Sequence, residues 1–282
     1  MDIMKRSTKW IIGIVIVVVI VGLGWFSFAH RSEQSKKTVK VGLMSGSKAD
    51  DKIWESVAET AKKKYGVTIQ FTHFTDYTQP NKALTQHEID LNSFQHYAFL
   101  DNWNKQNHTN IVSVGNTYIA PIRLYSNKYK NVKDIPNGGT IALPNDTSNE
   151  SRSLYLLKNA GLITLKDKKG FLGLNDIEKN PKNLKFKEVD ASQTPRVLNS
   201  VDGSIVNNTY AAPAHLSEKQ SIYVEPLNKD SKIWVNLIAA NKDQKNNKNY
   251  QDVVKAFQTK KTEQLVKKYY GNTEIPAWNR KF

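Results

Sequence analysis

The chain has 282 residues and no cysteine, and its 41 lysines and arginines against 26 acidic residues give a formal charge of +15. The absence of cysteine excludes a disulfide framework, thiolate metal sites, a cysteine nucleophile and a lipid-modified cysteine. With 39% hydrophobic and 10% aromatic residues, the composition excludes a globally disordered chain. The length allows one large domain or two smaller ones.

The first thirty residues determine the expected compartment. Residues 10–28 form a run without a charged residue, which is long enough to cross a bilayer as a helix. Three basic residues, Lys5, Arg6 and Lys9, precede it and favour a cytoplasmic N-terminus. The apolar regions of signal peptides are shorter, so we expect a retained transmembrane anchor rather than a signal peptide cleaved after Ala29. In both readings residues 31 onward lie outside the membrane, on the extracytoplasmic side, and the retained anchor would hold them at the cell membrane.

The excess of basic residues is dispersed along the chain. Lysines occur in short separate runs, for example at 62–64, 168–169 and 267–268. No zinc-finger spacing, basic zipper or RNA-binding aromatic signature accompanies them. We therefore expect a solvated basic surface suited to an anionic cell envelope, and no nucleic-acid partner.

A βαβ pattern follows a polar linker at residues 31–37. Residues 38–44 alternate as a strand, and residues 67–71 form a second strand. Between them, apolar positions repeat at helical spacing until Gly66. A unit of this length indicates a parallel sheet with helices on its faces.

The same alternation continues to the end of the chain. It predicts helices over 80–86 and 94–104, a helix capped by Thr147 with Glu150, a helix from Thr194–Pro195, and a helical tail. Strands are expected over 89–91, 140–143, 184–189, 204–206, 222–224 and 234–239, with extended segments in 111–125. This pattern predicts an α/β protein of two lobes, whose ligand lies in a cleft at the carboxyl ends of the strands.

One short motif suggests an enzyme. Ser45 and Lys48 match the S-x-x-K pattern of penicillin-binding enzymes, but neither S-D-N nor K-T-G accompanies it. The phosphate-binding, dinucleotide-binding, zinc-protease and serine-hydrolase motifs are also missing from the sequence. These motifs therefore give little support to an enzyme.

Three histidines keep a metal-capture alternative open. His73, His87 and His96 lie within 24 residues and could bind zinc together with Asp76 or Asp90. Their intervals of 14 and 9 residues fit no single helical face, however. We therefore expect no metal site, and we keep zinc capture as the weaker hypothesis.

A different group of residues indicates capture of an amino acid or a short peptide. Aromatic side chains, including Tyr77, Phe94, His96 and Phe99, are expected near strand ends beside polar amides. Arg152 stands in the first turns of a predicted helix. A helix N-terminus with a nearby guanidinium group makes a site for a carboxylate.

Several ordered blocks of sequence carry a resemblance to a known family. They are Asp76–Leu84, Asp90–His96, Leu124–Ser126, Ile141–Asp146, Asn149 with Arg152, Ile205–Asn207 with Tyr210–Ala211, and Val235–Ile238. Together they closely resemble the NlpA/MetQ family, the methionine-binding lipoproteins that serve ABC importers. The resemblance extends from about Val39 to Trp278.

The resemblance implies an α/β, two-lobed periplasmic-binding-protein-like fold of type II. It also implies a transport role that is not enzymatic and needs no cofactor. The ligand would be L-methionine, and the partners an ABC transporter permease and its ATPase. A receptor for a methionine-containing dipeptide or another amino acid remains an alternative. The expected lobes are residues 38–126 with 227–282, and residues 127–226, after the anchor or signal segment at 1–30.

The resemblance also implies the ligand-binding residues. In the family an arginine and asparagines hold the amino-acid backbone, and these fall on Arg152, Asn207 and Asn236, with Asn149 in the same block as the arginine. The aromatic pocket falls on Tyr77, Phe94, His96 and Phe99. An aromatic wall suits a thioether, because sulfur–aromatic contacts contribute about 0.3–1.5 kcal/mol each.

Two positions depart from the family pattern. The family is normally tethered through a lipidated cysteine, so the apolar helix at 10–28 would be the anchor here. Arg123 stands where relatives usually carry a small residue. It would either face the cleft and recognise a further acidic group, or face outward as part of the basic surface.

Overall fold

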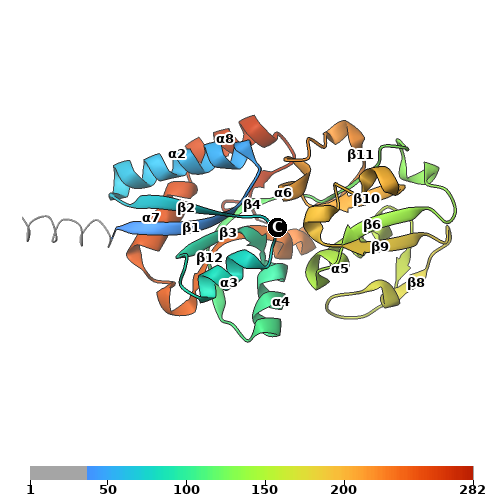
Figure 1. The fold of residues 1–282 in the computed structure, drawn as a ribbon, viewed down its shortest axis with the longest axis horizontal. Helices are drawn as coiled ribbons and strands as arrows, with labels where there is room; N and C mark the ends of the chain where they lie inside the picture. The colour runs from blue at the N-terminus through green and yellow to red at the C-terminus, as the bar shows by residue number, and fades with distance from the viewer. Residues whose placement is uncertain (1–36, 282) are drawn as a thin grey trace, which may run out of the picture. The chain divides into compact units, whose positions relative to one another are not determined.

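The computed structural model describes residues 37–281, and residues 39–282 form one compact unit (Figure 1). The expected anchor at 10–28 and most of the linker lie outside the described residues. Within residues 37–281, no helix is both long enough and apolar enough to cross a membrane.

A six-stranded sheet forms the first lobe, in the spatial order β13–β4–β12–β3–β1–β2. Its strands are β1 Thr38–Met44, β2 Thr68–Phe74, β3 Leu91–His96, β4 Ile111–Ile119, β12 Val235–Asn241 and β13 Ile275–Pro276. β1 runs parallel to β3, whereas β12 is antiparallel to both β3 and β4. The predicted βαβ unit is confirmed, because β1, α2 and β2 follow one another and the two strands are neighbours.

Helices cover both faces of this sheet (Figure 1). One apolar cluster joins it to α2 Lys48–Tyr65, α7 Lys248–Phe257 and α8 Lys260–Tyr270, and another joins it to α3 Gln79–Thr85 and α4 Tyr97–Asn107. α2 begins after Ser47, whose hydroxyl accepts from the backbone N–H of Asp50, and ends at Gly66 with φ of 72°. These are a regular N-cap and a left-handed C-terminal glycine.

A five-stranded sheet forms the second lobe, in the order β11–β5–β10–β6–β9. Its strands are β5 Arg123–Tyr125, β6 Thr140–Pro144, β9 Lys185–Val189, β10 Gly203–Val206 and β11 Ser221–Val224, accompanied by α5 Thr147–Asn159 and α6 Asn208–Ala211. A two-stranded sheet, β7 Thr164–Leu165 with β8 Ile177–Lys179, and seven 3-10 turns complete the described chain. The turns are Val132–Asp134, Leu174–Asp176, Ala191–Gln193, Leu198–Ser200, Glu218–Gln220, Lys229–Trp234 and Lys242–Gln244.

The chain passes between the two sheets after β4 and again after β11. The two crossovers lie side by side, because the backbone N–H of Glu225 donates to the carbonyl of Ile122 at 3.0 Å. The two-lobed α/β fold is thus confirmed. β5, expected in the first lobe, pairs with β10 and β11 in the second, so the first crossover precedes residue 126. The other lobe limits stay predictions.

Three local predictions were wrong. The helix expected from residue 94 begins at Tyr97, because Phe94 and His96 end the fully buried strand β3. The cap of α5 is Asp146, whose carboxylate accepts from the backbone N–H of Asn149. The segment after Thr194 forms turns rather than an α-helix.

Candidate functional site

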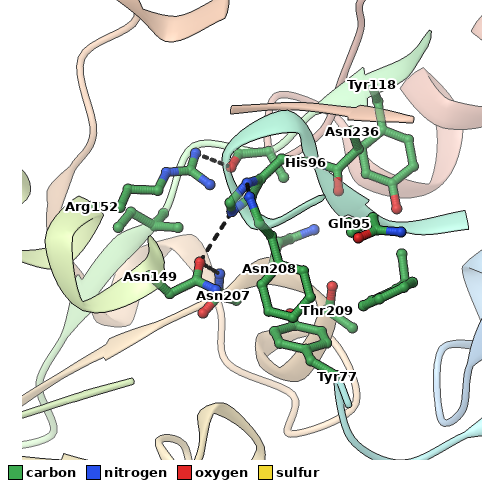
Figure 2. Close-up of a pocket in the computed structure, with 14 residues that line it drawn as sticks. Tyr77, Gln95, His96, Tyr118, Asn149, Arg152, Asn207, Asn208, Thr209 and Asn236 are labelled. Atoms are coloured by element: carbon green, nitrogen blue, oxygen red, sulfur yellow. Dashed lines mark hydrogen bonds between the residues drawn. The ribbon is translucent and has the colours of Figure 1, made fainter. Parts of the chain in front are cut away.

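A cavity lies beside the crossovers, where the two lobes meet (Figure 2). Its empty space, counted out to the open mouth, is about 400 Å³. The lining residues are Tyr77, Phe94, Gln95, His96, Phe99, Tyr118, Ala120, Ile122, Asn149, Arg152, Asn207, Asn208, Thr209 and Asn236.

All eight side chains expected to bind ligand line this one cavity. The first lobe contributes Tyr77 before α3, Phe94 and His96 from β3, Phe99 from α4 and Asn236 from β12. The second lobe contributes Asn149 and Arg152 from α5 and Asn207 at the N-cap of α6. The structure therefore brings together residues that are up to 159 positions apart, from Tyr77 to Asn236. Their roles toward a ligand remain predictions.

Three mutually contacting aromatic rings, Tyr77, Phe94 and Phe99, form the apolar wall of the cavity. Tyr77 lies at the centre, with ring-centroid distances of 5.7 Å to Phe94, 5.8 Å to Phe99 and 4.9 Å to Tyr210. Phe94 and Phe99 are also in contact, edge to face at 5.7 Å. Tyr210, in α6 of the second lobe, lies outside the lining and packs against Tyr77. These separations are typical of interacting aromatic pairs.

Arg152 is the cation of the site and is only 2% exposed. Its Nε donates to Oε1 of Glu225 at 2.8 Å, and its Nη2 donates to Oε2 of Glu225 and to the carbonyl of Ala120. The guanidinium also lies 4.9 Å from the ring centroid of Trp234. This pairing with Glu225 was not predicted. Of the three guanidinium nitrogens, Nη1 is left without a hydrogen bond to the described residues.

Asn149 joins the two lobes through its side-chain amide. Its Nδ2 donates to both carboxylate oxygens of Asp146, while its Oδ1 accepts from Nδ2 of Asn207 at 2.8 Å. Nε2 of His96, from the other lobe, lies 3.3 Å from the same Oδ1. Because Asn207 uses its N–H group here, its carbonyl oxygen remains as an acceptor at the cavity.

His96 is held as a neutral imidazole in one tautomer. Its Nδ1 accepts from the backbone N–H of Phe99 at 3.0 Å, as the N-cap of α4. The proton therefore sits on Nε2, which donates to Asn149. Burial, and then the nearby positive charge of Arg152, lowers the pKa of His96 to about 3. The site thus contains one permanent cation and a neutral donor.

Sequence reasoning missed the residues that support this lining. Gln95 belongs to a buried network in which Nδ2 of Asn81 donates to Oε1 of Gln95, and Nε2 of Gln95 donates to Oδ1 of Asn81 and of Asn92. Trp234 packs between His96, with ring centroids 5.1 Å apart, and Arg152. The signal that could have indicated this network is the presence of amide side chains inside apolar segments, since buried amides require hydrogen-bond partners.

The remaining candidate residues lie elsewhere. Arg123 is 5% exposed and absent from the lining, so it faces neither the cavity nor solvent; its Nη2 lies 3.5 Å from Glu218. The hydroxyl of Ser45 donates to the carbonyl of Phe74. His73 contacts Asp51, and His87 lies near Asn241, apart from His96. Residues 37–281 contain no group of three or more side chains suited to a metal.

Comparison with known proteins matches this chain to the NlpA lipoprotein model over residues 39–278. The chain belongs to the NlpA lipoprotein family. A relative from Pasteurella multocida, named a probable D-methionine-binding lipoprotein MetQ, is 42% identical over 252 residues, or 89% of this chain and 90% of the relative. The resemblance seen in the sequence is therefore confirmed.

Two solved structures share the fold. The substrate-binding protein of a methionine transporter from Streptococcus pneumoniae is 44% identical, with a TM-score of 0.82 over 86% of this chain and 96% of that one. A nutrient-binding protein from Burkholderia cenocepacia bound to methionine is 40% identical, with a TM-score of 0.81 over 85% and 99%. The NlpA family member described here differs from a lipid-tethered protein in having no cysteine.

Proposed function

We propose that the chain is the substrate-binding protein of an ABC importer for L-methionine, and not an enzyme. The observation that carries this proposal is the cavity, where a buried guanidinium, free amide oxygens and an aromatic wall meet at the junction of two lobes. Membership of a family with methionine-binding relatives supports it.

The polar half of the cavity has the groups that an amino-acid backbone needs. Nη1 of Arg152 can donate to the ligand carboxylate, because Nε and Nη2 already donate to Glu225 and to the carbonyl of Ala120. Oδ1 of Asn207 and the amide of Asn236 can accept from the ammonium group. The thioether would then lie against Tyr77 and Phe94, where sulfur–aromatic contacts are favourable.

Lobe closure is the proposed mechanism. His96 and Asn149 face each other across the junction, and so do the rings of Tyr77 and Tyr210. A ligand that contacts both lobes stabilises the closed state relative to the open one. The transporter's permease and ATPase would then accept the ligand from the closed protein.

The anchor is part of the same proposal. Residues 10–28 are uncharged and follow a basic segment, so a membrane-spanning helix would replace the lipid that the chain cannot carry without cysteine. This places the two lobes on the extracytoplasmic side of the cell membrane. Extraction of the chain from membranes by carbonate would contradict a spanning helix, whereas retention until detergent is added supports it.

Calorimetric titration of the full chain in detergent tests the ligand. The protein is unfolded and refolded to remove bound ligand, then titrated in parallel with L-methionine, D-methionine, glycyl-methionine and zinc. Tight binding of L-methionine with weaker binding of the other three supports the proposal. Preference for the dipeptide or the D-amino acid keeps the transport role and changes the substrate. Binding of zinc alone would refute the amino-acid site.

A further inference from the structure

A second carboxyl group, that of Glu274, is buried at the lobe junction. Unlike Glu225, which pairs with Arg152, it forms no ion pair with the described residues. Glu274, between α8 and β13, is 2% exposed. Its Oε1 accepts from Nδ2 of Asn208 at 2.8 Å, and its Oε2 has no hydrogen-bond partner among the described residues. Asn208 is the first residue of α6, in the second lobe, and lines the ligand cavity (Figure 2).

We propose that Glu274 is a positioning residue for the ligand site: its buried carboxyl group, in the neutral form, holds the amide of Asn208 across the lobe junction. The expected effect on ligand binding rests on the proposed function, whereas the neutral state of the carboxyl group does not depend on it. With Nδ2 of Asn208 occupied by Glu274, Oδ1 is the amide atom available to a ligand ammonium group.

The surroundings of Glu274 favour the neutral form. Glu274 interacts electrostatically with Asp50 of α2, Tyr270 of α8 and Tyr118 of β4. None of these is a cation. Burial, and then the negative charge of Asp50, raises the pKa of Glu274 well above its usual value, against a lowering effect of the Asn208 hydrogen bond. An ionised carboxylate with an unpartnered oxygen would be costly in this position.

The contact also links the lobes in a way that depends on closure. β13 pairs with β4, where Pro276 lies opposite Tyr118, so Glu274 is attached to the first sheet. Asn208 moves with the second lobe, since its neighbour Asn207 follows directly on β10. The hydrogen bond therefore forms only when the lobes are together, and it contributes to the closed state that the ligand stabilises.

Two sets of measurements on the full chain in detergent test this role. In titrations with L-methionine, we expect Glu274→Ala to weaken binding about tenfold and Asn208→Ala to weaken it at least as much. The double variant should be no weaker than Asn208→Ala, because Glu274 acts on the ligand only through Asn208. Glu274→Gln keeps an acceptor for Asn208 without a charge, so we expect its affinity to stay within about twofold of the parent. Exposed Glu88→Gln is the matched control.

Unfolding against pH tests the neutral carboxyl group without any ligand. Above about pH 4.5 the unfolded chain releases the Glu274 proton while the folded chain keeps it, so the parent loses stability as pH rises. Glu274→Gln has no such loss. Its stability relative to the parent should therefore increase with pH, by up to roughly tenfold in the unfolding equilibrium constant per pH unit, while Glu88→Gln shows no such trend.

The outcomes separate this inference from the proposed function. Unchanged methionine affinity in both alanine variants, or additive losses in the double variant, overturns the positioning role. If the difference in unfolding free energy between Glu274→Gln and the parent does not change with pH, the neutral form of Glu274 is overturned. If the parent binds no methionine, the proposed function fails, and the inference is then decided by the pH trend together with non-additive unfolding of the Glu274→Ala and Asn208→Ala variants.

Discussion

The two halves of the cavity are built on opposite principles. The first-lobe half presents the rings of Tyr77, Phe94 and Phe99, which contact one another. The second-lobe half presents Arg152 and Asn149, each of which already has protein partners. Rings can adjust to a flexible ligand chain at little cost, whereas the polar groups are fixed in advance by hydrogen bonds. We therefore expect the aromatic half to tune affinity and the polar half to decide whether an amino acid binds.

The largest effect should come from removing the cation of the polar half. Arg152→Ala should weaken L-methionine binding by about 2–5 kcal/mol, because a buried charge partner of the ligand carboxylate is lost. It also leaves Glu225 buried and unpaired, which destabilises the fold. Calorimetry and thermal unfolding on the same samples measure both.

The double variant Arg152→Ala with Glu225→Gln separates these two consequences. Removing the unpaired charge should restore much of the stability without restoring binding. If binding returns together with stability, Arg152 acts only as a partner of Glu225, and its proposed contact with the ligand carboxylate is contradicted.

The amides behind the aromatic half should matter for stability rather than for recognition. Asn81→Ala removes the partner of Gln95 and Asn92, which are 2% and 0% exposed, so we expect a loss of about 1–3 kcal/mol in unfolding free energy. Asn107→Ala, an exposed asparagine at the end of α4, is the control. A loss no greater than the control's would show that the network relaxes or admits water.

His96 should reveal its neutral state through the pH dependence of folding. Its pKa is about 3 in the folded chain and near 6.5 when unfolded, so only the unfolded chain binds the proton between these values. Stability should fall as pH drops below about 6.5, by about 1.4 kcal/mol per pH unit. His96→Gln should lack this contribution, whereas exposed His73→Gln should keep it. A difference between parent and His96→Gln that is constant from pH 5 to 7 would contradict the neutral form.

The smallest effect should come from one ring of the aromatic half. Phe94→Leu should reduce the preference for methionine over norleucine by about 0.3–1.5 kcal/mol, because the two ligands differ at the sulfur. Phe257→Leu changes a buried ring in the other face of the first lobe and should leave the preference unaltered. An unchanged preference in Phe94→Leu would place the thioether elsewhere.

Local pattern was a good guide where a segment has one buried face. α2 followed its apolar spacing and its stop at Gly66. β3 did not, because all six of its residues are buried and the alternation that marks a half-exposed strand is absent. Its amides, Asn92 and Gln95, interrupt the apolar pattern although they bond to one another in the interior. The cap of α5 was misplaced by one residue, since Thr147 and Asp146 are both good capping residues.

The sequence by itself determined the α/β class, the family and eight of the fourteen residues that line the cavity, because ordered motifs and periodic burial are properties of neighbouring positions. The tertiary structure decided the rest. It paired Arg152 with Glu225, 73 positions away, buried Arg123 away from the cavity, and joined Glu274 to Asn208 across the lobes. These contacts form only after the chain has crossed between the sheets twice, so no spacing along the sequence could indicate them.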